Sequence, residues 1–106
     1  ASEPARVSMA PRYPPVAPAE IDEVLLRHPA IREAVCFGEP DQMLGEVPVA
    51  AIVVGGEVSD RELRDYCREH LAGAKVPVRL YRTETIPRTA TGKVQRRAVA
   101  AAFAAP

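Results

Sequence analysis

The sequence is poor in lysine and cysteine and holds no long apolar run. No apolar stretch approaches the ~18 residues that a membrane-spanning helix requires, and no charged start followed by an apolar segment marks a secretion signal. The two cysteines, Cys36 and Cys67, lie in apolar segments without the C-x-x-C or other spacing of metal ligands. We therefore expect two reduced, partly buried thiols, no membrane span and a cytoplasmic location.

The chain also lacks an excess of charge of either sign. Fourteen Lys and Arg residues are offset by fourteen Asp and Glu residues, so the formal net charge is zero. Without a long-range field to steer the protein onto phosphates, we expect neither nucleic acid nor an anionic membrane surface as a partner. Apolar residues at 47% and charged residues at 26% of the 106 positions indicate one soluble domain with a single modest core.

Proline placement and hydrophobic spacing divide the chain into an arm and a folded part. Five of the eleven prolines fall within the first eighteen residues, which predicts an extended arm over residues 1–15 and a domain over residues 16–106. Ser59 and Glu62 form a capping box at the start of a helix, and Gly73 suits its end. The expected elements, in chain order, are a helix from Pro18 to about His28, a strand between Ala30 and Glu39, an irregular loop GEPDQMLGE, a strand at 47–54, the capped helix, a strand at 78–83 and a helix at 94–103.

This order of elements predicts the fold class. Too few strands alternate with helices for a doubly wound parallel sheet. The first two strands are instead joined by a short loop, which favours antiparallel pairing. We expect an α+β fold in which a small, mainly antiparallel three-stranded sheet is packed with helices.

The stretch around Thr91-Gly92-Lys93 invites two interpretations that its neighbours do not support. A phosphate-binding loop of the G-x-x-x-x-G-K-[ST] type requires glycine where Pro87 stands and Ser or Thr where Val94 stands. A nucleic-acid-binding patch would carry interleaved aromatic residues, which KVQRR lacks. We therefore expect solvated charges at Arg88, Arg96 and Arg97.

Histidines and paired carboxylates give no clear site. His28 and His70 have no cysteine, serine or carboxylate at the spacing of a metal site or a catalytic triad. Surface or helix-capping roles are expected for both, and no metal site. Asp41 and Glu46 flank the loop between the first two strands, and a functional carboxylate pair there would require spatial proximity that sequence alone does not give.

Lys93 stands out by composition, because only two of the fourteen basic residues are lysines. A lysine ammonium is a compact charge on a flexible stem and can be acetylated, whereas an arginine guanidinium is a wider planar group. Lys93 is therefore a candidate functional residue. The alternative is an ordinary solvated side chain.

The segment IPRTATGKVQRR resembles the C-terminal signature of adenylate-forming enzymes, a superfamily of acyl-CoA synthetases, peptide-synthetase adenylation domains and luciferases. The signature has the form Pro-x-Thr-x-(Thr/Asn)-Gly-Lys-x-x-Arg, and its matches here are Pro87, Thr89, Thr91, Gly92, Lys93 and Arg96. Three further stretches are similar to the same C-terminal domain in the same order: VAPAEIDEVLLRHPAIREAVCFGEPD, GEVPVAAIVV and ELRDYCREHLAGAKVP. Thr91 and Gln95 favour the acyl-CoA synthetase branch.

The resemblance implies a two-step ligase reaction. A carboxylic acid reacts with ATP, with Mg2+, to give acyl-AMP, and coenzyme A or the pantetheine of a carrier protein then displaces AMP. It implies that Lys93 is the catalytic lysine of the first step and that Thr89, Thr91 and Gly92 shape the loop facing the substrate and ATP. It also implies a large N-terminal adenylation domain, in cis or in trans, that binds ATP and the acid. Without that domain the chain is expected to be inactive.

The N-terminal residues and a regulatory role are two points that the ligase reaction does not explain. Before Val16, acyl-CoA synthetases carry a hinge and a glycine-containing loop that lines the thiol tunnel, whereas this chain reads PRYPP at 11–15. Residues 1–15 are accordingly either a proline-rich arm or the remnant of a hinge. A second hypothesis is a stand-alone binding or regulatory module that a protein acetyltransferase modifies at Lys93, because lysines in this motif are acetylated in related synthetases.

Overall fold

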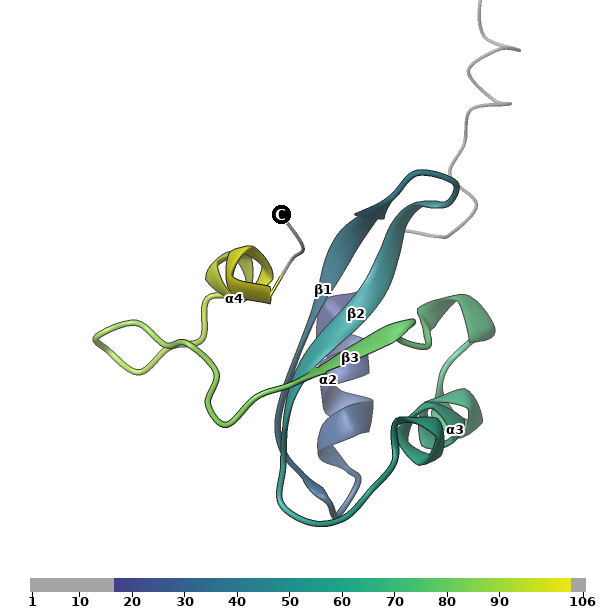
Figure 1. The fold of residues 1–106 in the computed structure, drawn as a ribbon, viewed down its shortest axis with the longest axis horizontal. Helices are drawn as coiled ribbons and strands as arrows, with labels where there is room; N and C mark the ends of the chain where they lie inside the picture. The colour runs from purple at the N-terminus through teal and green to yellow at the C-terminus, as the bar shows by residue number, and fades with distance from the viewer. Residues whose placement is uncertain (1–16, 104–106) are drawn as a thin grey trace, which may run out of the picture.

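A three-stranded sheet with strand order β1-β2-β3 forms the centre of the computed structural model, which describes residues 17–103 (Figure 1). The predicted arm over residues 1–15 lies outside the described residues. The elements are α2 (Pro18–Leu26), β1 (Ile31–Asp41), β2 (Gly45–Val54), α3 (Asp60–His70), the short 3-10 helix η1 (Gly73–Lys75), β3 (Arg79–Arg82) and α4 (Arg96–Phe103).

The sheet is mixed but mostly antiparallel. β1 and β2 form a long antiparallel hairpin that runs from the pair Ile31 and Val54 to the pair Asp41 and Gly45. The short β3 lies parallel to β2 on its other side, so β2 is the central strand. The predicted α+β class and the three-stranded, mainly antiparallel sheet are confirmed.

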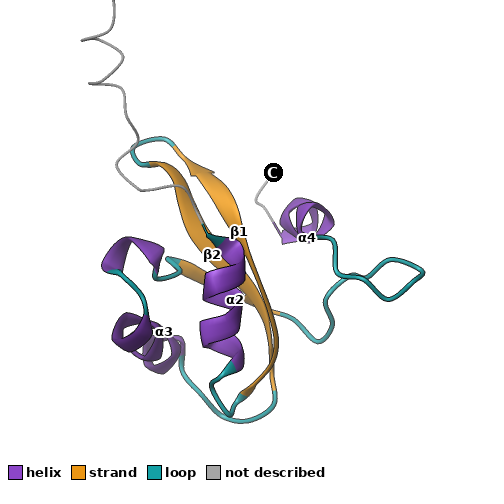
Figure 2. Cartoon of the chain, turned by 180° about the vertical axis from the view of Figure 1, so that it is seen from behind, coloured by secondary structure: helices purple, strands orange, loops and turns teal. Residues whose placement is uncertain are grey.

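Helices cover both faces of the sheet. Figure 2 shows α2 lying across one face, and the apolar side chains of α2 and α3 pack there against the alternate strand residues Cys36, Ala50 and Ile52. The intervening strand residues, such as Phe37 and Val49, point to the opposite face, where they pack with Val99 of α4 and with Ile86. Because both faces of β2 are covered, VPVAAIVV reads as a nearly continuous apolar run instead of an alternating one.

The irregular loop predicted at GEPDQMLGE is mostly regular strand, so that prediction was wrong in extent. Pairing between β1 and β2 continues through Asp41 and Gly45, which leaves a turn of only three residues, 42–44. One carboxylate oxygen of Asp41 accepts the N–H groups of Met43 and Leu44, both at 2.9 Å, and so closes this turn. Pro40 is tolerated because β1 is an edge strand.

The helix boundaries also differ in detail from those predicted. The Ser59 hydroxyl caps α3 by accepting the N–H of Glu62 at 3.0 Å, as predicted, but the Glu62 carboxylate approaches His28 Nε2 instead, at 3.3 Å. α3 ends at His70, because Leu71 is already extended, and Gly73 begins η1 instead of ending α3. The final helix begins at Arg96, two residues later than predicted.

Both cysteines are buried free thiols, as expected. Burial raises the pKa of Cys36 to about 12 and that of Cys67 to about 11. Both thiols therefore stay protonated at neutral pH and behave as small apolar core groups. Among residues 17–103 no helix has the length and hydrophobicity needed to cross a membrane.

Candidate functional site

The signature segment forms a small hairpin that projects from the body of the domain, seen as the yellow-green loop in Figure 1. Arg88 and Val94 make an isolated antiparallel bridge at its base. Within it, Thr89 N–H donates to the Lys93 carbonyl at 2.8 Å and Gly92 N–H donates to the Thr89 carbonyl at 2.9 Å. Gly92 has a φ of +84°, a left-handed conformation that glycine adopts without steric cost. The hairpin is therefore a closed, hydrogen-bonded turn.

The threonine side chains complete this turn. Thr89 Oγ1 accepts the backbone N–H of Lys93 at 3.1 Å and lies 2.9 Å from Thr91 Oγ1. Thr89 thus holds Lys93 twice, through its backbone N–H and through its side-chain oxygen. The structure brings together the four residues that the sequence singled out, at one tip of the molecule.

The two lysines of the chain have different surroundings. Lys75 Nζ lies 3.2 Å from a carboxylate oxygen of Glu20 on α2. Lys93 is exposed, and within residues 17–103 its ammonium group makes no hydrogen bond or ion pair. The hairpin therefore fixes the backbone of Lys93 and leaves its charged end available to a partner.

Arginines flank the hairpin, and the prediction of a solvated charge is wrong for Arg96, whereas Arg88 is exposed even though it has partners. Arg88 forms an ion pair with Glu33 of β1 and also donates to the Gly92 carbonyl at 3.4 Å. Arg96 donates from Nη1 to Asp22 Oδ2 at 2.9 Å and to the Cys36 carbonyl at 2.7 Å. Spacing along the sequence cannot reveal these contacts, since Asp22 and Arg96 are 74 positions apart. Arg97 is exposed, as predicted.

Asp22 and Arg96 together form hydrogen bonds with the backbone of Cys36 at the outer edge of β1. Asp22 Oδ1 accepts the N–H of Cys36 at 2.5 Å, and Arg96 donates to the carbonyl of the same residue. An edge strand leaves such backbone groups without a neighbouring strand, and side chains here take that place. Burial raises the pKa of the Asp22 carboxyl, and the Cys36 N–H and Arg96 oppose that rise. The ion pair joins α2 and α4, which pack on opposite faces, around the edge of the sheet.

The two histidines make local contacts in the structure. His28 is only 8% exposed, so the surface alternative fails for it. Its side-chain Nδ1 accepts the Ala30 N–H at 3.1 Å in the turn after α2, and its backbone N–H donates to the Leu25 carbonyl at 3.0 Å. His70 is exposed at the end of α3 and packs against Tyr66, at a centroid distance of 4.7 Å. Among the described residues, no three or more His, Cys, Asp and Glu side chains gather as a metal site would require.

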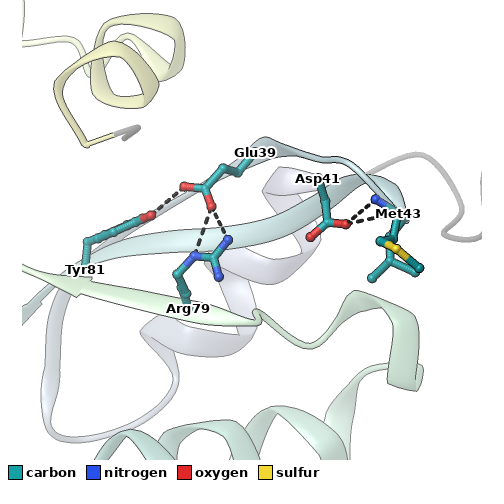
Figure 3. Close-up of polar contacts among 6 residues, drawn as sticks. Glu39, Asp41, Met43, Arg79 and Tyr81 are labelled. Atoms are coloured by element: carbon teal, nitrogen blue, oxygen red, sulfur yellow. Dashed lines mark hydrogen bonds and ion pairs between the residues drawn. The ribbon is translucent and has the colours of Figure 1, made fainter. Parts of the chain in front are cut away.

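A polar cluster that the sequence did not predict as a whole lies near the turn of the β1–β2 hairpin (Figure 3). The Glu39 carboxylate, in a residue only 7% exposed, accepts hydrogen bonds from Arg79 Nε at 2.9 Å and from the Tyr81 hydroxyl at 2.5 Å. Burial alone would raise the pKa of Glu39, but the bonds from Tyr81 and Arg79 outweigh it and lower the pKa. The Tyr81 pKa is raised, chiefly because its hydroxyl donates to Glu39.

The sequence predicts part of this cluster. The alternation in VRLYRT places Arg79 and Tyr81 on one face of β3. Their partner Glu39 was assigned to the edge of an irregular loop and so had no predicted face. Within the domain, the cluster fastens the short β3 to β1 across β2.

Together, the fold and the site define a small α+β domain that presents an exposed lysine on a hydrogen-bonded hairpin. The chain belongs to the family of AMP-binding enzyme C-terminal domains, whose model matches residues 20–93. The resemblance drawn from the signature is thereby confirmed, and the similar proteins include acyl-CoA ligases.

Three relatives illustrate this similarity. The chain is 46% identical over 91 residues to an oxalate–CoA ligase of Saccharomyces cerevisiae, covering 84% of this chain and 17% of that protein. A fatty acyl CoA synthetase of Mycobacterium tuberculosis superposes with a TM-score of 0.78 at 35% identity, over 83% of this chain and 18% of the other. The o-succinylbenzoate CoA synthetase of Bacillus subtilis, solved in complex with ATP and magnesium ion, gives 0.74 at 42% identity, over 79% and 17%.

Another structure of the Bacillus subtilis enzyme, a double mutant, holds the product analogue OSB-NCoA. This chain spans less than one-fifth of the length of each of these relatives. The shared region is therefore the C-terminal domain alone.

Proposed function

We propose that this chain acts as the mobile lid domain of an ATP-dependent acid–thiol ligase of the acyl-CoA synthetase type, with Lys93 as its adenylation lysine. Its partner is a large adenylation domain, in cis or in trans, to which we assign ATP, Mg2+ and the carboxylic acid. The observation that carries the proposal is the geometry of the hairpin. Its backbone bonds and Gly92 hold Lys93 at a projecting tip while the ammonium group stays without a partner in the described chain.

The chemistry calls for a positive charge at this point. In the first step a carboxylate oxygen attacks the α-phosphorus of ATP, the new P–O bond forms and pyrophosphate leaves. Negative charge accumulates on the carboxylate and phosphate oxygens, where an ammonium group stabilises it. Unit charges about 4 Å apart at an effective dielectric near 20 attract by roughly 4 kcal/mol. If that attraction is realised in the transition state, it accelerates the step by about a thousandfold.

In the second step the sulfur of coenzyme A, or of a carrier-protein pantetheine, attacks the acyl carbon and AMP leaves. No part of this step needs the ammonium group of Lys93. The two steps therefore differ in their expected dependence on Lys93. Without the large domain the chain holds only the lid, and we propose that it has no ligase activity by itself.

Substitution of Lys93 in the protein together with its large domain tests this assignment. We expect Lys93→Ala to reduce ATP–pyrophosphate exchange by about a thousandfold, while thiolysis of supplied acyl-AMP keeps its rate. Lys75→Ala is the matched control, since it removes the other lysine, whose exposed ion pair with Glu20 is worth little. An exchange rate in Lys93→Ala equal to that of Lys75→Ala would refute the proposal.

A second candidate function is regulation by acetylation of Lys93. The observation in its favour is the exposed amine on a projecting hairpin, which has no partner among residues 17–103 and which an acetyltransferase can reach. Its nitrogen would attack the acetyl carbon of acetyl-CoA, releasing coenzyme A and a proton and removing the positive charge. Mass spectrometry after incubation with a protein acetyltransferase and acetyl-CoA measures it, with Lys75 as the internal comparison. Label confined to Lys75, or absent from both lysines, would contradict it.

A further inference from the structure

Two arginines of the hairpin region attach it to the body of the domain from both sides. Arg88 precedes Lys93 and forms an ion pair with Glu33 of β1. Arg96 follows Lys93 at the start of α4 and bonds to Asp22 of α2 and to the backbone of β1. The hairpin that carries Lys93 is therefore held between two side chains that both end on the same edge strand.

The Arg96 contact is the stronger of the two anchors. Its partner Asp22 has a side chain only 17% exposed, and one Arg96 nitrogen serves both the carboxylate and the Cys36 carbonyl. Charge-assisted hydrogen bonds to a partly buried acceptor are stronger than exposed ion pairs. The Arg88 and Glu33 side chains are 45% and 33% exposed, so solvent screens their attraction more.

Only two residues, Val94 and Gln95, separate Lys93 from Arg96. Val94 pairs with Arg88 and packs against the apolar cluster under α4, and Gln95 accepts the N–H of Val99 to begin that helix. Arg96 is thus connected to the backbone of Lys93 through two residues that each make contacts of their own.

We propose that Arg96 and Asp22 are positioning residues for Lys93: their ion pair, closed over the edge of β1, sets where the hairpin delivers the ammonium group. This inference rests on the proposed function of Lys93. Neither Arg96 nor Asp22 is expected to touch the substrate. Their expected effect is indirect: displacing the Lys93 ammonium group by about 1 Å can lower the rate by about a hundredfold.

A double-mutant cycle in the protein with its large domain tests the inference. We expect Arg96→Ala to lower kcat for ATP–pyrophosphate exchange by roughly 10- to 100-fold, with little change in KM for ATP and no change in thiolysis of supplied acyl-AMP. In a Lys93→Ala background the same substitution should lower exchange by no more than about twofold, because residues that act as one unit are not additive. An equal loss in both backgrounds would overturn the inference.

Three further variants make the test specific. Arg97→Ala is the matched control, because Arg97 is the next residue of α4, is exposed and has no side-chain hydrogen bond or ion pair within the described part of the chain. Arg96→Lys should recover part of the activity, since a single nitrogen of Arg96 makes both contacts. Asp22→Asn keeps an oxygen for the Cys36 N–H but removes the charge, so it should lower exchange in the same direction as Arg96→Ala.

The outcomes separate the two proposals. If Lys93→Ala leaves exchange intact, the proposed function fails. If Lys93→Ala is severe while Arg96→Ala matches Arg97→Ala, only the positioning role fails. Should Arg96→Ala prevent folding, measured by the melting temperature, Asp22→Asn and Arg96→Lys carry the same test, and full activity in both would overturn the inference.

Discussion

Substituting Gly92 with alanine tests the hairpin conformation with little else disturbed. A Cβ added at Gly92 would meet no atom within 4 Å, so there is no steric clash with the rest of the domain. The only cost is the backbone conformation at φ +84°, which a residue with a Cβ adopts at a cost of about 1–2 kcal/mol. We therefore expect Gly92→Ala to lower the free energy of unfolding by about 1 kcal/mol.

Gly73 offers a matched control for this substitution. It too has no atom within 4 Å of an added Cβ, but its φ is not in the left-handed region. Gly73→Ala should therefore be neutral or should stabilise by up to about 1 kcal/mol, through loss of freedom in the unfolded chain. Both substitutions add one methyl group, so the difference between them isolates the backbone strain at Gly92.

Urea unfolding, followed by circular dichroism, measures both variants. With a slope of about 1–2 kcal/mol per molar for a chain of this size, Gly92→Ala should shift the midpoint down by roughly 0.5–1 M. Gly92→Asn should fall between alanine and glycine, because asparagine tolerates the left-handed region better than alanine does. If Gly92→Ala and Gly73→Ala unfold at the same midpoint, the left-handed turn does not control the hairpin.

Two further predictions concern buried groups. The pKa of Glu39 is lowered in the folded state, so its contribution to stability is present above its unfolded pKa and is lost as pH falls through the folded value. Glu39→Gln should therefore lower stability at neutral pH, and in acid titrations of the unfolding midpoint it should flatten the decline that accompanies protonation of Glu39. An equally steep decline in the variant would contradict this sign. Cys36 and Cys67 are buried, with pKa values of about 12 and 11. Both should therefore resist alkylation by iodoacetamide in the folded protein and react once urea unfolds it. Rapid labelling of the native chain would contradict their burial.

Much of the fold could be predicted because its signals are local. The capping serine, Ser59, lies three residues from the N–H that it binds. The β-branched run of β2 is long enough to identify a strand whichever strand it pairs with. The GEPDQMLGE segment shows the opposite case, since glycine, proline and aspartate indicate a turn locally while pairing with β2 extends the strand through most of them.

In the candidate site, too, short-range features could be predicted and long-range contacts could not. Thr89, Gly92 and Lys93 could be identified from the sequence because they fall in one short segment that resembles the family signature, and the bonds that shape it join residues at most four positions apart. The sequence predicts a solvated charge at Arg96, and this prediction fails because the partners of Arg96, Asp22 and the Cys36 carbonyl, lie 74 and 60 positions away. No periodicity or motif in a single sequence carries information over that distance.

The sequence by itself thus determined the order of elements, the α+β class and the position of Lys93 in a loop with Thr89, Thr91 and Gly92. These features follow from side-chain spacing and from backbone preferences of single residues, which act over a few positions. Only the tertiary structure decided which polar groups meet: Glu39 with Arg79 and Tyr81, and Arg96 with Asp22 at the edge of β1. Such pairs form because folding removes water from a carboxylate or a strand edge, and the group then needs whichever partner the packed elements bring within reach.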